Sequence, residues 1–242
     1  MGDYLMLADG DRVLCAVSGG IDSLTLVRVL QLWQEKAPLS YTVHGIHIDM
    51  QPQAVRPGVV ARKVASILEE LSIPCHILAA AWSPVRDILE NDQTKNICFR
   101  CARSRRTQLF SYADQYHYNK LAMGHHRDDI IETFFLNMFY AGNLSTMVPK
   151  QELFSGRLAL VRPLAYLDKQ EVAQLGYQLS LQEVRTVCPL FEKTTRRQVS
   201  DVLDAIERRV PEVRKNIFAA LGNVRPDYLL NPKYRSAHEN RS

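Results

Sequence analysis

The sequence of 242 residues contains no apolar run of the roughly 18 residues that a membrane-spanning helix requires. Its opening residues, MGDYLMLADGDR, have no basic stretch followed by an apolar stretch, which is the pattern of a secretory signal. With 46% hydrophobic and 23% charged residues, the composition also lacks the excess of charge that keeps a chain unfolded. We therefore expect a folded, cytoplasmic protein that is neither secreted nor embedded in a membrane.

Two common phosphate-binding motifs are also missing. The chain has no Gly-x-x-x-x-Gly-Lys-Ser/Thr segment, which excludes a Walker loop, and no Gly-x-Gly-x-x-Gly segment, which argues against a Rossmann dinucleotide site. Cysteine is scarce, and the five that occur are an odd number that cannot all pair in disulfides. Because cytosolic thiols stay reduced, we consider metal binding or redox chemistry for these cysteines.

Positive charge is concentrated in two places. The net charge of +4 equals the excess within residues 192–242, which hold 11 Lys+Arg and 7 Asp+Glu. A second basic run, from Lys95 to Arg106, contains no acid and would attract anions. A solvated helix face explains a single basic run equally well, so charge alone does not indicate RNA.

Short apolar runs alternate with helix-spaced apolar patterns over most of the chain. Parallel strands cannot be joined by tight turns, so this alternation predicts a doubly wound α/β fold with a parallel sheet. We place a soft boundary near residue 165, between an α/β domain (1–165) and a helical, basic C-terminal region (166–242). We expect strands at 12–17, 41–48, 73–80 and 120–123, an edge strand at 157–161, helices at 22–30, 59–71, 102–116, 128–140, 168–179, 195–208 and 212–221, an irregular segment at 83–96, and a loose tail at 226–242.

The first segment that can carry chemistry is SGGIDS (residues 18–23), between the first expected strand and helix. Its two glycines allow a tight turn with successive N–H groups exposed, and the positive end of the next helix adds to this anion cradle. Doubly wound folds bind ligands at the carboxyl edge of the sheet, where this turn must lie. A bare Gly-Gly turn is usually structural, but flanking serines and an aspartate in this setting favour a phosphate site.

A second polar segment, GHHRDDIIET (residues 124–133), follows another expected strand whose carboxyl end faces the same crevice. Asp129 and Glu132 share a helix face, so they could hold one metal ion together with phosphates. The alternative is that acids in a first helical turn only stabilise the helix dipole, by about 0.3 to 1 kcal/mol each. The nearby glycine turn favours the functional interpretation.

The third segment is CFRC (residues 98–101), to which the distant Cys188 can be added. Redox sites and half-complete zinc sites both contain a single Cys-x-x-Cys pair, and a nearby histidine would be needed to complete a zinc site. Three thiolates would instead leave one iron of a [4Fe-4S] cluster open, as a sulfur-handling catalyst needs. Cys188 precedes Pro189 and is expected in a loop, whereas Cys15 and Cys75 lie in expected strands and are simplest as core residues.

The Ser-Gly-Gly-x-Asp-Ser signature resembles that of the PP-loop ATP pyrophosphatase superfamily, whose members cleave ATP between the α and β phosphates. With CFRCARSRR, GHHRDDIIETFFLNMFYAG, VRPLAY and RRQV, it makes residues 10–220 similar to the TtcA group, which forms 2-thiocytidine in the tRNA anticodon loop with an iron-sulfur cluster. This resemblance implies an ATP-dependent tRNA sulfurtransferase with an adenine nucleotide alpha hydrolase-like fold. ATP would adenylate C2 of a loop cytidine, and sulfur would then replace AMP.

The same resemblance implies roles for individual residues. It implies a [4Fe-4S] cluster on Cys98, Cys101 and Cys188, Mg²⁺ on Asp22 and Asp129, and catalytic roles for Asp22, Asp129 and Arg105. ATP would be bound by Ser18, Gly19, Gly20, Ile21, Asp22, Ser23, His47, Gly124 and His125, and tRNA by Arg103, Arg105 and Arg106. The implied partners are tRNA and a sulfur donor such as a cysteine desulfurase, and a homodimer is compatible with the resemblance. The C-terminal region would complete the cluster site and the tRNA surface.

Other activities remain open at this point. The TtcA group usually has Pro-Cys-x-x-Cys where this chain has only Cys188-Pro189, a feature that also resembles 2-thiouridine enzymes, and Ile21 stands where lysine is usual. A PP-loop ligase such as lysidine synthetase would use an amine nucleophile and no cluster. A non-catalytic RNA-binding protein with a zinc site would not bind ATP. Metal, sulfide and ATP binding therefore separate the alternatives.

Overall fold

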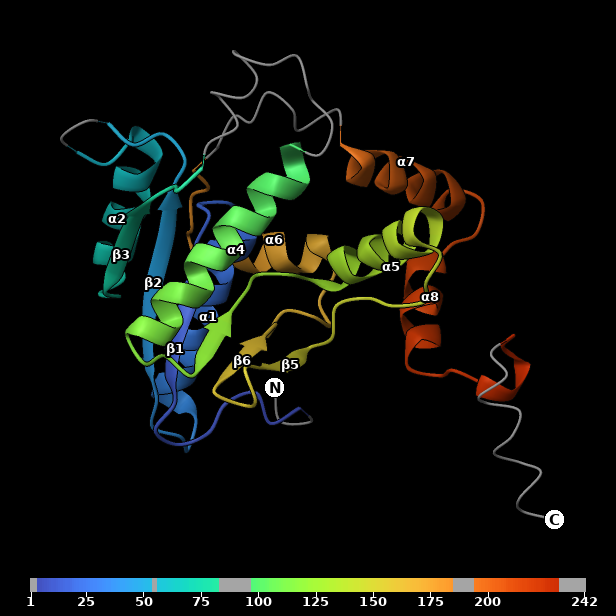
Figure 1. The fold of residues 1–242 in the computed structure, drawn as a ribbon, viewed down its shortest axis with the longest axis horizontal. Coiled ribbons are helices and arrows are strands. Elements are labelled where there is room, and N and C mark those ends of the chain that lie inside the picture. The colour runs from blue at the N-terminus through green and yellow to red at the C-terminus, as the bar shows by residue number, and fades with distance from the viewer. Residues whose placement is uncertain (1–3, 54–55, 83–96, 185–193, 231–242) are drawn as a thin grey trace.

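A computed structural model describes residues 4–53, 56–82, 97–184 and 194–230 of the chain. Over these residues strands and helices alternate around a six-stranded sheet (Figure 1). The strands are β1 (Arg12–Ala16), β2 (Thr42–Asp49), β3 (Cys75–Ala79), β4 (Lys120–Ala122), β5 (Lys150–Leu153) and β6 (Leu158–Val161). The helices are α1 (Ile21–Lys36), α2 (Val59–Glu70), α4 (Ile97–Gln115), α5 (Arg127–Ala141), α6 (Lys169–Gln178), α7 (Thr195–Glu207), α8 (Val213–Leu221) and the short η3 (Pro226–Tyr228). In this part of the chain no helix has both the length and the apolar character needed to cross a membrane.

The sheet has the strand order β3-β2-β1-β4-β6-β5, and all neighbouring strands are parallel except β5. The order reverses beside β1, because β2 lies on one side of it and β4 on the other. Cys15 of β1 pairs with Ala122 of β4, so the loops that follow these strands leave the same edge side by side. This is the switch point at which doubly wound sheets bind ligands, and the expected fold class is confirmed.

The strand expected at the edge, residues 157–161, is instead an inner strand. β6 lies between β4, its parallel partner, and β5, which closes the sheet in the antiparallel direction. All four residues of β6 (LALV) are buried, whereas β5 (KQEL) has two exposed residues in its middle. A short, charged strand is typical of a protected sheet edge, and its apolar pattern is too weak to be recognised in the sequence.

Helices cover both faces of the sheet, because successive side chains of a strand point to opposite faces. Val13 and Cys15 of β1 face α1, α2 and α6, whereas Leu14 faces α4. Cys15 is fully buried, and this burial raises the pKa of its thiol, so it is a core residue as expected. Cys75 is partly buried against the same cluster.

The C-terminal helices belong to different layers. α6 begins with the predicted capping box, in which Asp168 and Glu171 exchange hydrogen bonds, and it packs on α1 with Val172 in the main core. α7 and α8 instead pack on α5, where Val199 and Leu203 contact Ile131. In Figure 1 these two helices lie beyond α5, at the side of the sheet.

Candidate functional site

The glycine turn, residues 18–20, connects β1 directly to α1. Gly19 has a φ of +97°, a left-handed conformation that glycine adopts without strain. The N–H groups of Ser18 and Gly19 donate to the Ser23 hydroxyl at 3.1 and 3.3 Å, and the N–H of Gly20 donates to Ser18 Oγ at 3.3 Å. Three consecutive donors thus converge on hydroxyl oxygens at a helix N-terminus, which is the arrangement that binds a phosphate.

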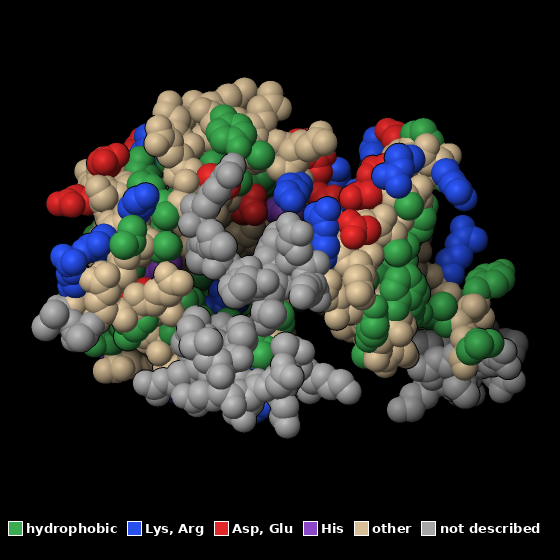
Figure 2. Space-filling view, turned by 90° about the horizontal axis from the view of Figure 1, so that it is seen from above, with side chains coloured by type: hydrophobic (Ala, Val, Ile, Leu, Met, Phe, Trp, Pro, Cys, Tyr) green, Lys and Arg blue, Asp and Glu red, His purple; other side chains and the backbone are tan. Residues whose placement is uncertain are grey.

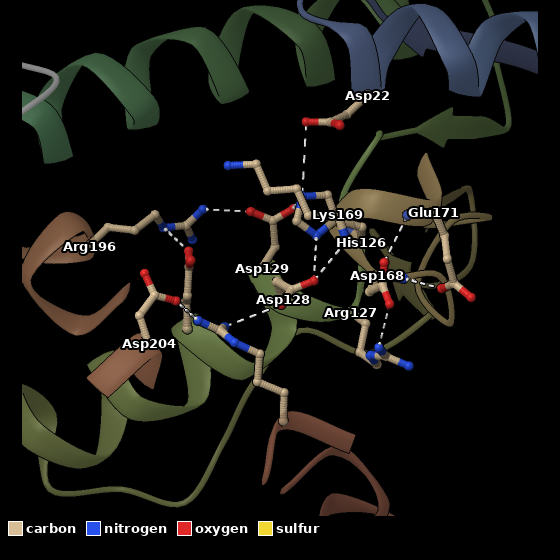
Figure 3. A network of polar contacts seen from close by, with 12 residues as sticks. Asp22, His126, Arg127, Asp128, Asp129, Asp168, Lys169, Glu171, Arg196 and Asp204 are labelled. Atoms are coloured by element: carbon tan, nitrogen blue, oxygen red, sulfur yellow. Dashed lines mark hydrogen bonds and ion pairs between the residues drawn. The ribbon is translucent and has the colours of Figure 1, made fainter. Parts of the chain in front are cut away.

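The loop after β4 lies against the first turn of α1. A Cβ atom on Gly124 would lie 2.9 Å from the carbonyl oxygen of Asp22 and 3.1 Å from Ser23 Cα, so a side chain here would force the backbone apart. This contact places the N-terminus of α5 beside the glycine turn. The two polar segments that the sequence predicts to share a crevice are therefore neighbours (Figure 3).

His126, the N-cap residue of α5, is buried at the centre of three carboxylates. Its Nε2 atom lies 3.4 Å from Asp129 Oδ2 and 3.9 Å from Asp22 Oδ2, and its Nδ1 atom lies 3.7 Å from Asp128 Oδ2. The backbone N–H of His126 also donates to Asp129 at 3.0 Å. Asp22 of α1 and Asp129 of α5 consequently flank one imidazole ring, although they are far apart in the sequence (Figure 3).

Asp22 carries a polar atom suited to a bound cation. Its Oδ1 atom is buried and has no hydrogen-bond partner among the described residues. Burial raises the pKa of Asp22, and the negative charge of Asp129 adds to the effect, whereas His126 opposes it. Mg²⁺ prefers carboxylate oxygens and would stabilise the ionised carboxylates of Asp22 and Asp129.

The described residues contain no set of three His, Cys, Asp or Glu side chains that could hold a metal ion. A magnesium ion at Asp22 and Asp129 would therefore keep phosphate or water ligands, which is the usual behaviour of this ion.

Arg196, in the first turn of α7, was not recognised from the sequence. It donates to Asp129 Oδ1 at 3.1 Å and to Thr133 Oγ1 at 3.0 Å, and its Nε atom lies 3.7 Å from Glu132 Oε2. Glu132 therefore contacts a cationic partner, Arg196, on the helix face that the sequence predicts could hold a metal ion. The RRQV segment contains this arginine, but its role depends on the packing of α7 against α5.

Asp128 differs from its neighbour Asp129, because its oxygens have structural partners. It accepts hydrogen bonds from the backbone N–H of Lys169 at 2.8 Å and from Arg214 of α8 at 3.2 Å. Arg214 also donates to Asp204 and Glu207 of α7. Asp128 therefore joins α5 to α6 and, through Arg214, to α7 and α8.

His47 and Ile21, two residues predicted to bind ATP, flank the glycine turn and have side-chain contacts inside the fold. His47 is buried and donates from Nδ1 to the Val17 carbonyl at 2.7 Å, and burial lowers its pKa. The Ile21 side chain packs toward α6, where a Cβ atom on Gly176 would lie 2.6 Å from Ile21 Cδ1. Contact between Ile21 and ATP would consequently involve its backbone.

His125 has several guanidinium groups around it. Arg162, which follows β6, donates from Nε to His125 Nδ1 at 3.3 Å. The pKa of His125 is lowered to about 4, mainly by burial and in addition by the positive charges of Arg162, Arg196 and Arg106, whereas the negative charge of Asp129 opposes the shift. His125 is therefore neutral at physiological pH, with its proton on Nε2.

The Cys-x-x-Cys pair lies in the first turns of α4, which begins at Ile97 and thus earlier than the expected residue 102. Cys98 is exposed and Cys101 is half-buried, and their spacing puts them on one helix face. Arg105 follows one turn later and is exposed. Cysteine binds iron or zinc as the thiolate. Cys188 and the segment 83–96 lie outside the described residues.

The arginines of α4 are exposed, as a nucleic-acid surface requires. Arg103 lines a hollow of about 400 Å³ beside Trp82, and Arg100 Cζ lies 5.0 Å from the centre of the Trp82 ring. Arg106 is close enough to His125 and Arg162 to affect both of their pKa values. In Figure 2, which looks onto the carboxyl edge of the sheet, acidic, basic and histidine side chains meet between the sheet and the C-terminal helices.

A glycine turn after β1, an acidic helix start after β4 and the doubly wound sheet together define a protein of the PP-loop class. The family model of the PP-loop domain matches residues 3–184. The tRNA-cytidine(32) 2-sulfurtransferases of Pseudomonas syringae pv. tomato and Marinomonas sp. are 36% and 34% identical over 235 residues, which cover 96% of this chain and 84% and 82% of those proteins. The chain belongs to the PP-loop family and, within it, to the tRNA-cytidine(32) 2-sulfurtransferase (TtcA) group.

Two solved structures have the same fold. The U34-tRNA thiolase NcsA from Methanococcus maripaludis, with its [4Fe-4S] cluster, matches with a TM-score of 0.71 at 22% identity, over 90% of this chain and 72% of that chain. The NAD⁺ synthetase from Burkholderia pseudomallei matches with a TM-score of 0.53 at 20% identity, over 90% and 83% of the two chains. At these identities the likeness concerns the arrangement of sheet and helices.

Proposed function

We propose that this chain is an ATP-dependent sulfurtransferase that replaces the C2 oxygen of cytidine 32 in tRNA by sulfur. The observation that carries the proposal is the pairing of Asp22 and Asp129 across His126, beside the glycine turn, in a chain 36% identical to tRNA-cytidine(32) 2-sulfurtransferases. Neither acid has an apolar packing role, and both face the switch point of the sheet.

The reaction has two steps that the chain's residues support. The C2 oxygen of cytidine attacks the α phosphate of ATP, and pyrophosphate leaves toward the N–H groups of Ser18, Gly19 and Gly20. Sulfide sulfur then adds to C2, and AMP leaves with the former C2 oxygen. Asp22 and Asp129 would hold Mg²⁺, which neutralises phosphate charge when bound. His126 keeps the two carboxylates in place, and the backbone contact at Gly124 fixes their separation.

We propose Cys98, Cys101 and Cys188 as ligands of a [4Fe-4S] cluster. When bound, a cluster with one iron free of protein ligands supplies a site for sulfur. The described part of α4 fits this role, because Cys98 and Cys101 share a face at the helix start. Arg105 would contact phosphate or RNA beside them. A sulfur donor such as a cysteine desulfurase, a homodimer and a cytoplasmic location remain predictions from the sequence.

Anaerobic purification followed by a thiolation assay tests this function. The reconstituted protein should contain iron and sulfide, and with ATP, Mg²⁺ and sulfide it should thiolate a tRNA transcript with cytidine at position 32 and release AMP. A transcript with uridine at that position should not react. Thiolation of U34, or a zinc protein that binds no ATP, would contradict the proposal.

Cysteine variants provide the matched comparison. Cys98→Ser and Cys101→Ser should remove the brown colour and the thiolation activity, while ATP binding at the glycine turn persists. Cys75→Ser, which changes a partly buried thiol of the main core, should retain colour and activity. Retention of the cluster in Cys101→Ser would refute the proposed ligand set.

A further inference from the structure

Arg162 is a buried arginine without an acidic partner in the described part of the chain. It is only 4% exposed. Its side chain donates to two neutral groups, the Val148 carbonyl at 2.5 Å and His125 Nδ1 at 3.3 Å. A buried guanidinium is normally paired with a carboxylate, because removing the charge from water is strongly unfavourable. An arginine in this situation indicates that an anion from outside completes the site.

A second arginine approaches Arg162 from another element. The pKa of Arg162 is lowered to about 10, mainly by burial and in addition by the positive charge of Arg106 of α4, which therefore lies near it. Two guanidinium groups from separate elements repel each other unless an anion is shared between them. The hydrogen bond from Arg162 to Nδ1 also fixes the tautomer of His125, so that Nε2 carries the ring proton and adds a third donor.

These three donors lie beside the glycine turn and do not belong to it. The turn follows β1, whereas His125 and Arg162 follow β4 and β6, the next strands of the sheet. The exposed side chains of Arg103 and Arg105 extend the positive charge from Arg106 along α4. This continuity with an exposed basic helix favours a phosphate of a nucleic-acid chain over a phosphate of ATP as the missing anion.

We propose that Arg106, Arg162 and the Nε2–H of His125 form a binding site, which we call the arginine seat, for one backbone phosphate of the RNA. This phosphate is adjacent to the base that reacts. The inference rests on the proposed function and adds a binding site to it. By holding this phosphate, the arginine seat places the extruded base between the thiols of α4 and the carboxylates Asp22 and Asp129.

Salt-dependent binding of a fluorescent anticodon stem-loop to the full chain is the first test. Arg162→Gln should weaken binding by about tenfold, the loss of one charge-assisted hydrogen bond, and reduce the slope against salt concentration by about 0.7 to 0.9. Arg162→Lys keeps the charge and should keep the slope. The matched control is Arg157→Gln on the exposed turn between β5 and β6, which should change neither quantity.

A scan with neutral methylphosphonate linkages, one position at a time around the target cytidine, identifies the phosphate. One linkage should weaken binding to the unmodified protein about tenfold and have no further effect on Arg162→Gln, because both changes remove the same contact. Thermal unfolding confirms that each variant is folded. If Arg162→Gln does not fold, the exposed Arg106→Gln replaces it in the same cycle.

The outcomes are distinguishable. If no linkage couples to Arg162 or Arg106 and the variants instead lose ATP or pyrophosphate affinity, the seat binds a nucleotide phosphate and the inference is wrong. If neither RNA nor ATP binding changes, Arg162 has only a structural role and the inference is also wrong. If the unmodified protein does not bind the stem-loop at all, the proposed function itself fails.

Discussion

The loops after β1 and β4 lie side by side, but they are built in different ways. The first forms its anion cradle from its own backbone and hydroxyl groups, within residues 18–23. The second, residues 124–133, depends on Lys169 of α6, Arg196 of α7 and Arg214 of α8 to hold its acids. The glycine turn thus forms these hydrogen bonds within its own segment, whereas the acidic half of the site requires that the C-terminal helices are in place.

The adjacent acids of the second loop test this distinction most strongly. Asp129→Asn should reduce thiolation by at least about 100-fold, since it removes a charge that faces the reacting phosphates. Asp128→Asn should instead lower the free energy of unfolding by about 1.5 to 3 kcal/mol, because it removes one of the three carboxylate partners of the mostly buried Arg214. Turnover and urea unfolding, measured on both variants, give the comparison.

Asp22→Asn is the control for the first prediction, because Asp22 belongs to the other loop and faces the same crevice. It should lose turnover as Asp129→Asn does and should unfold at nearly the same urea concentration as the unmodified protein. Normal turnover in either variant would show that the carboxylate is outside the reacting centre.

Gly124→Ala should disturb the contact between the two loops. The new Cβ would lie 2.9 Å from a backbone oxygen of α1, and neither backbone has a flexible end that can move away. We expect about tenfold weaker ATP binding in a calorimetric titration. Gly222→Ala, where the nearest atom is 3.7 Å from the new Cβ, is the matched control and should bind ATP normally. Equal ATP affinity in the two variants would mean that the loops need not touch.

The sequence predicted what depends on local patterns. Alternating apolar runs sufficed for the parallel strands, and residues 18–23 and 124–129 could be placed at one edge because each follows a strand. β5 was missed because KQEL has no apolar alternation. Arg162 and Arg196 were present in the VRPLAY and RRQV segments without an assigned role, since their partners depend on how β6 and α7 pack, which periodicity does not specify.

The last expected effect concerns the acid sensitivity of His125. Its pKa is about 4 in the folded chain and near 6.5 in the unfolded chain, so the unfolded chain binds more protons between these values and stability falls as the pH falls. His125→Asn should remove this contribution, which is at most about 3 kcal/mol between pH 7 and pH 4. Urea unfolding at several pH values measures it.

The exposed His117→Asn is the matched control and should keep the pH dependence of the unmodified protein. Burial also lowers the pKa values of His44, His47 and His76, so part of the acid sensitivity should remain in both variants. An identical pH profile for His125→Asn would show that His125 accepts a proton in the folded chain as readily as in water.

The last residue of the main core also touches the glycine turn. Val184 packs in the same buried cluster as β1, and its N–H donates to the Gly19 carbonyl at 2.8 Å. Val184 therefore connects the main core to the glycine turn and supports the conformation of that turn. Helices α7 and α8 follow Val184 in the chain and pack on α5. The conformation of the glycine turn therefore depends on a residue that follows α6, far along the chain from residues 18–23.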